Sequence, residues 1–292
     1  MVRALLLGSD TPLGHALLER HYLLQRHEML PFTLSACRWK SERQAKKCVV
    51  RAKCDIVVDL RIEAAADGGI PIQELDLRRC RWVAKACQRN ASAYLYVSSS
   101  RVFSGALGRH YSEDDQPDNE ESIGTLLRRA EELVAGTCER HLLLRLGPVF
   151  SYEGTNLVSR MLEPLREGGS LSLDDNLRGS PVAARDAARV LLAVLDQLGT
   201  GMEPWGIYHY GSSDTATFYE FAEALLASAS QFFEVSASAV QLERDPERLE
   251  PLNRALDCTK ILNTFAIRQI TWRSAMGDIV KQYYDRQQSE GG

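Results

Sequence analysis

Two groups of residues in this chain could do chemistry, and each directly follows a short apolar run. The first is the loop Gly8-Ser-Asp-Thr-Pro-Leu-Gly14, which follows the apolar residues 4–7. A glycine-rich turn after a strand lets backbone N–H groups and the start of a helix approach a phosphate closely. The middle of the loop is Thr11, whose β-branched side chain either crowds a bound phosphate or donates its hydroxyl to it. We therefore predict a phosphate-binding turn that has a β-branched residue, Thr11, at its centre.

The second group is Ser98, Ser99 and Ser100, which follow the apolar residues 94–97 and precede Arg101. A serine hydroxyl can act as a nucleophile or a proton donor when a base stands beside it. No partner base is evident for these serines in the sequence. They can equally form a polar strand end that hydrogen-bonds to nearby backbone, and both interpretations stay open.

A third feature is local positive charge. Residues 38–53 carry seven basic side chains against one acid, Glu42. One interpretation is a solvated helix face. A second places Arg38 and its neighbours against the 2′-phosphate of NADPH, because the stretch follows the second predicted strand. A third is a docking surface for an acidic protein or RNA, since residues 78–85 add a second basic cluster; RNA ranks last because no aromatic residues for stacking accompany either cluster.

The elements that must position these residues alternate along the first half of the chain. Short runs rich in Leu, Val and Ile, typical of strands buried on both faces, cover residues 4–7, 29–34, 55–60, 94–97 and 142–146. Amphipathic stretches separate them, notably residues 72–87 and 123–134. Pro12 fits the first turn of the first helix, where a missing N–H costs little. The alternation predicts an α/β fold, a Rossmann-like doubly wound parallel sheet.

After residue 150 the pattern changes to helices separated by isolated short strands. We expect a Rossmann-like dinucleotide-binding domain over residues 1–150 and a smaller C-terminal α/β substrate-binding domain over residues 151–292. A strand is predicted over residues 206–210 and a helix over 217–233, and segments near 206–235 are expected to return to the first domain. A closing helix is predicted over residues 272–284, followed by a polar tail over 286–292 that frays.

Composition excludes several classes of protein. Of 292 residues, 45% are hydrophobic, and 35 Lys and Arg against 39 Asp and Glu give a net charge of −4, which argues against a surface built for nucleic acid. Apolar runs are too short for a signal peptide or a membrane span, so we expect a cytoplasmic protein with no membrane partner. The seven cysteines include no C-x-x-C pair and the six histidines have no metal-ligand spacing, so we expect free thiols and no metal.

Several longer motifs occur along the chain in a fixed order. They include Val97-Ser-Ser-Ser-Arg-Val-Phe-Ser-Gly105, Tyr111-Ser-Glu-Asp-Asp-Gln-Pro117, Leu144-Arg-Leu-Gly-Pro-Val-Phe150, and Arg178-Gly-Ser-Pro181 with Asp186. Respectively, they are similar to S-T-D-Y-V-F-D-G, Y-x-E-x-D-x-P, L-R-x-x-x-V-F-G and G-S-P-T…D of the dTDP-4-dehydrorhamnose reductases, extended short-chain dehydrogenases/reductases. Further matches lie at residues 156–158, 206–209, 218–222 and 251–257. The resemblance spans nearly the whole chain and implies the fold of that family.

The resemblance also implies a catalytic arrangement, a Ser or Thr with a Tyr and a Lys spaced Y-x-x-x-K on a helix. The Lys lowers the pKa of the phenol, and the Tyr protonates the carbonyl of a keto-sugar nucleotide as hydride arrives. The family's Y-G-x-S-K-x-x-x-E falls on residues 123–131, which puts Ile123 at the Tyr and Leu127 at the Lys. Neither side chain can carry a proton, and no tyrosine of the chain has a lysine four residues later. Only Ser99 remains, so no functional catalytic residue is expected.

Binding positions follow from the same resemblance. The positions expected to face NADP or NAD are Gly8, Thr11, Pro12, Leu13, Gly14, Arg38, Asp59, Leu60, Arg61 and Ser98. The family usually ends its third strand with N-A-A-A, so Leu60 and Arg61 put bulky side chains where small ones leave room, which compromises cofactor binding. The residues expected in the substrate pocket are Arg101, Asn156, Arg178 and Ser180.

Two hypotheses for function result. The first is a catalytically degenerate member of the family that binds a nucleotide or sugar nucleotide and acts as a regulatory or scaffolding subunit, with a protein partner or as a homo-oligomer. The second is an active NAD(P)H-dependent reductase of a 4-keto-6-deoxy sugar nucleotide, with Tyr111 or water as proton donor. Asp115, four residues after Tyr111, would raise the pKa of that phenol. We favour the first hypothesis.

Overall fold

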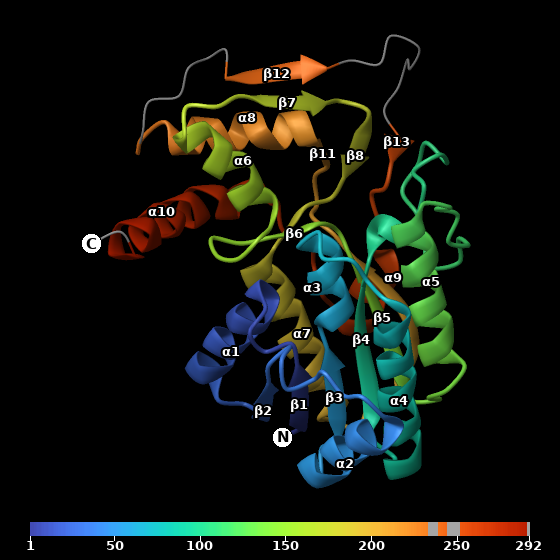
Figure 1. The fold of residues 1–292 in the computed structure, drawn as a ribbon. Coiled ribbons are helices and arrows are strands. Elements are labelled where there is room, and N and C mark those ends of the chain that lie inside the picture. Colours follow the sequence, from blue (N-terminus) through green and yellow to red (C-terminus); the bar gives the residue numbers. More distant parts are fainter. Residues whose placement is uncertain (233–238, 244–251, 291–292) are drawn as a thin grey trace.

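The fold is organised around a six-stranded parallel sheet in the order β10-β5-β4-β3-β1-β2 (Figure 1). The computed structural model describes residues 1–232, 239–243 and 252–290. The strands of the sheet are β1 (Arg3–Leu7), β2 (Glu28–Phe32), β3 (Ile56–Asp59), β4 (Ala93–Ser99), β5 (His141–Leu146) and β10 (Gly206–Tyr210). These strands match the predicted ones within a few residues, and the doubly wound α/β class is confirmed.

The middle strands are buried on both faces, as parallel strands between two layers of helices must be. Leu6 of β1 is paired with Val58 of β3, and both are 0% exposed. The same register aligns Leu7 with Asp59, and the N–H of Leu60 donates to the carbonyl of Leu7 at 3.0 Å. The loops that follow β1 and β3 therefore start side by side at the carboxyl edge of the sheet.

Helices cover both faces of this sheet. On one face α1 (Pro12–Leu24) packs against α7 (Ala184–Leu198), and on the other lie α2 (Glu42–Ala52), α4 (Glu74–Asn90) and α5 (Ser122–Ala135) (Figure 1). Shorter segments are α3 (Arg61–Asp67), the 3-10 turn η1 (Ser100–Val102) and α9 (Thr259–Phe265). The two predicted amphipathic helices correspond to α4 and α5. No helix of the described ranges is long and apolar enough to cross a membrane.

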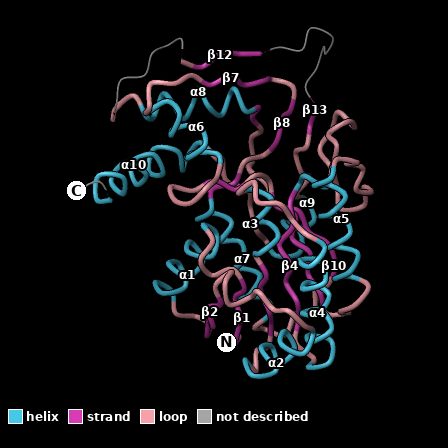
Figure 2. Tube along the Cα trace, viewed as in Figure 1, coloured by secondary structure: helices cyan, strands magenta, loops and turns pink. Residues whose placement is uncertain are grey.

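A second group of helices and short strands lies beyond the carboxyl edge of the sheet (Figure 2). It contains a second apolar cluster. Its helices are α6 (Leu157–Arg166), α8 (Phe218–Ala229) and α10 (Arg273–Glu290). Its strands are the pair β7 (Leu171–Asp174) and β12 (Val240–Glu243), and the sheet of β11 (Ala216–Thr217), β8 (Leu177–Gly179) and β13 (Leu252–Asn253). The pair β6 (Val149–Phe150) and β9 (Val182–Ala183) joins the two regions. Phe221 and Trp272, with ring centroids 5.2 Å apart, anchor this second core.

The division of the chain at residue 150 needs correction. Helix α7, strand β10 and helix α9 come from the second half of the sequence, yet their apolar side chains join the core of the main sheet. Of the segments near 206–235, β10 joins the main sheet, whereas α8 packs with α10 in the second cluster; residues 233–235 lie outside the described residues. The reason is that α7 covers the sheet beside α1, while the apolar face of α8 is buried by α10.

The expected fraying of the polar tail is also wrong as far as the structure describes it. Helix α10 continues to residue 290, held by an Arg286–Glu153 ion pair of 2.6 Å and by a 3.0 Å hydrogen bond from Arg166 to Gln287. The expected helix end at residue 233, residue 251 of the last matched segment and tail residues 291–292 lie outside the described residues.

One buried ion pair joins the sheet to a covering helix. Arg145 on β5 and Glu131 on α5 are 2% and 5% exposed, and their closest N–O distance is 2.7 Å. The guanidinium also lies 5.0 Å from the Phe103 ring centroid and 3.3 Å from Nε2 of His209. Burial, and then the positive charge of Arg145, lowers the pKa of His209 to about 3. His209 is therefore neutral at physiological pH and can accept a hydrogen bond from Arg145.

Replacing Glu131 by Ala leaves the Arg145 guanidinium buried without its carboxylate. We expect the free energy of unfolding to fall by about 3–5 kcal/mol, measured by urea denaturation. Glu132→Ala on the same helix is the matched control, because its side chain is 67% exposed and its ion pair with Arg128 is 3.8 Å long. The control should change stability by no more than about 0.5 kcal/mol. Equal losses in the two variants would contradict the role of the buried pair.

Candidate functional site

The loop after β1 is tied together by its own hydrogen bonds. Gly8 has a φ of +86°, and the N–H groups of Gly8 and Ser9 both donate to the carbonyl of Phe32, at 2.8 and 3.0 Å. The Thr11 hydroxyl donates to the Gly8 carbonyl at 2.7 Å and accepts from the N–H of Gly14 at 3.0 Å. Thr11 is thus the N-cap of α1. We expected its side chain either to crowd a bound phosphate or to donate its hydroxyl to it. In the structure the hydroxyl makes its hydrogen bonds within the loop.

The other residues predicted to face a cofactor divide into two groups. Leu60 and Arg61 lie directly beside the loop: a Cβ added to Gly8 would stand 3.5 Å from the Leu60 Cβ and 3.6 Å from the Arg61 nitrogen. Leu13, the second residue of α1, is buried. Arg38 is exposed, like the other basic side chains of residues 38–53, which lie on α2, in the segment before it and at its C-cap. Arg38 therefore stands at the surface, on the segment that follows β2.

The positions matched to catalytic residues lie on β4 and α5. Ser99 is 1% exposed, and its Oγ accepts a hydrogen bond from the Arg101 N–H at 3.3 Å. Ser98 is fully buried, and its Oγ has no hydrogen-bond partner within the described part of the chain. On α5, Leu127 is 0% exposed in the main core, and Ile123 is half-buried against it. This face of α5 packs as an apolar helix face.

A cleft of about 390 Å³ opens between the main sheet and the second cluster, at the carboxyl edge of the strands. That volume falls in the range of small-molecule sites. Its apolar wall comes mainly from α6, β7 and α8, through Leu157, Met161, Leu171, Leu173, Phe218 and Phe221. Its charged lining residues are Asp67, Arg101, Arg160, Arg178 and Arg254. The cleft thus combines an apolar wall with a cationic one.

The arginines of the cleft differ in what they contact. Arg101 donates to the Ala66 carbonyl at 2.7 Å, and Arg160 donates to the Asp67 carbonyl at 2.8 Å. Arg178 instead pairs with Glu220 at 2.9 Å, and Arg254 lies 3.6 Å from Glu121. Burial raises the pKa of the Asp67 carboxyl, and the charges of Arg101 and Arg160 both act to lower it. The lining nevertheless holds four guanidinium groups against this one carboxyl, so this wall attracts anions.

A carboxyl pair stands behind the cationic wall. Glu63 and Asp67 lie one turn apart on α3, and Asp67 accepts the N–H of Val149 at 2.7 Å. Burial raises the pKa of both carboxyls, and the charge and hydrogen bond of Asp67 raise the pKa of Glu63 further. Oε2 of Glu63 is buried with no partner in the described ranges. The Glu63 carboxyl is therefore held in its protonated form, which limits the negative charge at the cleft.

The structure brings together only part of the predicted substrate pocket. Arg101 and Arg178 line the cleft, but Asn156 and Ser180 do not. The Asn156 side chain caps α6 by accepting the N–H of Val158 at 2.9 Å. Ser180 is 1% exposed because it is wedged beside Gly147 and Gly211, where an added Cβ would come within 1.9 and 2.7 Å of it.

Three charged residues of the cleft were missed by sequence reasoning, namely Asp67, Arg160 and Arg254. They come from the end of α3, from α6 and from the segment after β13. No local spacing relates these positions, so the sequence carries no signal that would group them.

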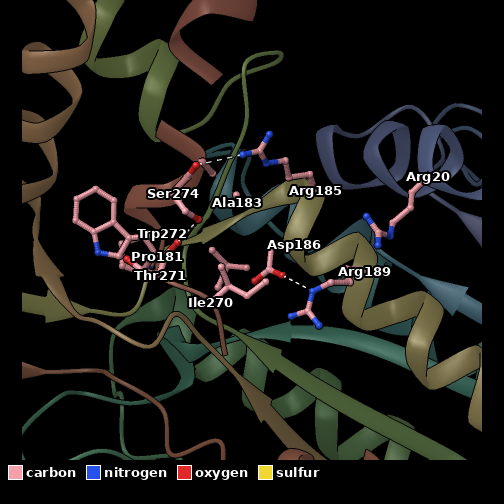
Figure 3. Close-up of a pocket in the computed structure, with 12 residues that line it drawn as sticks. Arg20, Pro181, Ala183, Arg185, Asp186, Arg189, Ile270, Thr271, Trp272 and Ser274 are labelled. Carbon is pink, nitrogen blue, oxygen red and sulfur yellow. Dashed lines mark hydrogen bonds and ion pairs between the residues drawn. The ribbon is translucent and has the colours of Figure 1, made fainter. Parts of the chain in front are cut away.

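A smaller cavity of about 210 Å³ lies between α7 and the segment that leads into α10 (Figure 3). Arg189 pairs there with Asp186 at 2.7 Å (Figure 3). Arg185 pairs with Asp278 of α10 at 2.8 Å. Two of its arginines are thus neutralised by carboxylates of the chain itself. The larger cleft is the better candidate for binding an anionic ligand.

The parallel sheet, the glycine turn where strand order reverses and the cleft at the carboxyl edge define a Rossmann-type protein of the extended short-chain dehydrogenase/reductase class. The family model of the RmlD substrate binding domain matches residues 2–285. The chain therefore belongs to that family, as its motifs predict.

Individual relatives are similar over nearly their whole length. The chain is 26% identical over 293 residues to the dTDP-4-dehydrorhamnose reductase of Aggregatibacter actinomycetemcomitans, covering 96% of this chain and 98% of that one. It is 23% identical over 290 residues to the spore coat polysaccharide biosynthesis protein SpsK of Bacillus subtilis (strain 168), covering 97% and 98%. Its fold is similar to that of the dTDP-4-dehydrorhamnose reductase from Bacillus anthracis in complex with NADP, with a TM-score of 0.77 at 19% identity, covering 96% and 98%.

Replacing Thr11 by Ala removes the side-chain cap of α1. We expect the free energy of unfolding to fall by about 0.5–2 kcal/mol, measured by urea denaturation. Ser41→Ala at the start of α2 is the matched control, because the Ser41 side chain makes no capping hydrogen bond. An unchanged stability of the Thr11 variant would show that its hydroxyl is not bonded within the loop.

Replacing Glu63 by Gln tests the carboxyl pair through pH. A folded-state pKa raised above the unfolded value, about 4.3 for Glu, gives stability that is present at acid pH and lost as pH rises through the folded pKa. We therefore expect the wild type to lose stability relative to Glu63→Gln as the pH rises from about 5. Urea denaturation at a series of pH values measures this difference, with the exposed Glu19→Gln as control. A difference independent of pH would contradict the protonated carboxyl.

Proposed function

We propose that this chain binds a sugar nucleotide, or a nucleotide anion of that class, in the cleft, and acts as a regulatory or scaffolding subunit without transferring hydride. The observation that carries this proposal is the apolar pair Ile123 and Leu127 on α5, at the positions that the family motif gives to Tyr and Lys. Leu127 is 0% exposed in the core. Neither side chain can donate a proton to a carbonyl.

The alternative, an active reductase with another proton donor, is less well supported by the geometry of Tyr111. Its ring is 0% exposed and stacks on Phe103 with centroids 4.1 Å apart. Its hydroxyl accepts the N–H of Gly105 at 3.0 Å and donates to Asp118 at 3.2 Å. The proton of Tyr111 is thus directed to a carboxylate, and Tyr111 is not among the residues that line the cleft.

The cleft suits the proposed ligand class in both charge and surface. Arg101 and Arg160 bond to backbone carbonyls and have the Asp67 carboxyl as a shared neighbour, so two guanidinium groups stand against one carboxyl. Positive charge is thus left for phosphate oxygens, to which arginine bonds with two parallel N–H groups. The apolar side chains of Phe218 and Phe221 supply a surface for a base or sugar ring. Relatives named as dTDP-4-dehydrorhamnose reductases favour a dTDP-sugar as the first compound to test. A chain that binds such a ligand without turning it over can act through occupancy on a protein partner or a second copy.

Titration calorimetry with dTDP and with dTDP-glucose tests this binding. We expect Arg101→Gln and Arg160→Gln each to weaken it by about 10- to 100-fold, since each removes a charge-assisted hydrogen bond of about 1.5–3 kcal/mol. Arg128→Gln is the control, because Arg128 is exposed on α5. Equal affinity in all variants, or no binding by the wild type, would contradict the proposed site.

Oxidation of NADPH with a 4-keto-6-deoxy sugar nucleotide tests the absence of hydride transfer. We expect no turnover above the rate without enzyme, because Ile123 and Leu127 stand at the positions that the family motif gives to Tyr and Lys. A dTDP-4-dehydrorhamnose reductase assayed in parallel is the positive control. Measurable turnover by this chain would establish the reductase alternative instead.

A further inference from the structure

The strand order places a crevice between β1 and β3. The chain leaves β1 towards β2 on one side, and the strands that follow β3 lie on the other. In open α/β sheets a dinucleotide binds outside the carboxyl ends of the strands at this reversal. A dinucleotide here would need space above Gly8 and Asp59, the residues that begin the first loop and end β3.

That space is filled by side chains of the protein itself. The Asp59 carboxylate accepts hydrogen bonds from Nε and Nη2 of Arg61, at 2.9 and 2.7 Å, and from the hydroxyl of Tyr94 at 2.7 Å. The guanidinium of Arg61 lies 5.3 Å from the Trp39 ring centroid. We call Trp39, Asp59, Arg61 and Tyr94 the crevice cluster. It links the segment after β2 and the start of α3 to the end of β3 and to β4.

The crevice cluster is closed to solvent. Asp59 and Tyr94 are 0% exposed, Trp39 is 6% exposed and Arg61 is 9% exposed. Burial and the negative charge of Asp59 hold the pKa of Tyr94 well above its ordinary value, so its phenol stays protonated and donates. An entering adenosine would have to displace Arg61 and leave a buried carboxylate without its counter-charge, which is strongly unfavourable.

The part of the crevice that would hold phosphate is equally unsuited to it. A pyrophosphate on a helix N-terminus needs free N–H groups, but Pro12 has none and the N–H of Gly14 is bonded to Thr11, which leaves that of Leu13 in the first turn. Two carboxylates lie at the same end of the helix. Asp10 accepts the N–H of Leu34 at 2.6 Å, and Glu153 lies 2.8 Å from Nδ1 of His15 on the first turns of α1.

The loop that carries Glu153 also covers this end of the helix. Gly154 has a φ of +70°, and a Cβ added to it would stand 2.8 Å from Cγ of Pro12. The second carboxylate oxygen of Glu153 pairs with Arg286 of α10. The loop is thus fixed from both sides, by α1 and by the last helix.

We infer that the crevice of this protein is a closed structural core occupied by its own residues, and that NADP and NAD do not bind there. Arg61 and Trp39 take the adenosine side of the crevice, and the loop of Glu153 and Gly154 covers its phosphate side at Pro12. The structure of the Bacillus anthracis reductase is a complex with NADP. We do not expect this chain to form such a complex. The inference stands apart from the ligand of the cleft, and the two can fail separately.

Titration calorimetry and thermal unfolding of the full wild-type chain with NADPH, NADP⁺ and NADH test the inference directly. We expect no saturable heat and no shift in Tm at about 1 mM, the upper end of typical KM values. A dTDP-4-dehydrorhamnose reductase that binds NADP serves as the positive control. Saturable binding of NADPH would overturn the inference. Binding without turnover would overturn it alone, whereas turnover would also overturn the proposed function.

A set of variants tests whether Arg61 is fixed in the crevice. We expect Arg61→Ala to lower Tm by several degrees, and the double variant Asp59→Asn/Arg61→Ala to lower it less, because the double variant leaves no unpaired charge. Arg51→Ala on the exposed face of α2 is the control. If Arg61→Ala does not fold, Arg61→Lys replaces it, since Lys keeps the charge but loses the paired bonds. A Tm of either Arg61 variant equal to that of the wild type would show a mobile side chain and overturn the inference.

Discussion

The requirement that a buried charge be paired shapes this molecule more than any other constraint. Asp59 ends the third strand of the sheet with no exposure to solvent, and such a carboxylate is tolerated only with a counter-charge and hydrogen bonds. Arg61 and Tyr94 supply both. Arg61 stays over Asp59, and Trp39 lies against its guanidinium, which is the arrangement on which the inference of a closed crevice rests.

The charged residues of the cleft are arranged differently from those of the crevice cluster. Arg101 and Arg160 bond to backbone carbonyls, which satisfy their N–H groups without cancelling their charge. Burial raises the pKa of Glu63 and Asp67, and the charge of Asp67 raises the pKa of Glu63 further, so that Glu63 adds little negative charge near this wall. The crevice cluster therefore pairs its charges internally, whereas the cleft is lined by four arginines and one carboxyl. This difference in charge is why we propose the cleft as the anion site.

The elements that stabilise the fold do not depend on a Tyr and a Lys at positions 123 and 127. The packing of α1 and α7 on the sheet, and the buried pair of Arg145 with Glu131, involve other side chains. Apolar residues at positions 123 and 127 fit the same packing, since Leu127 lies wholly in the core. A family fold can therefore keep its core while the residues at its site differ.

The sequence by itself determined the strands of the sheet, the helices α4 and α5, the turn at Gly8 and the family, because hydrophobic periodicity, glycine placement and motif order are local properties. Only the tertiary structure decided that Arg160, Arg254 and Asp67 share one cleft, that α7 packs beside α1 in the first core, and that Glu153 lies against α1. It also showed that Asn156 and Ser180 are not among the residues that line the cleft. The physical reason is that periodicity shows which face of an element is buried but not which distant segment buries it. Charged residues on separate elements meet only when the packing of those elements is fixed.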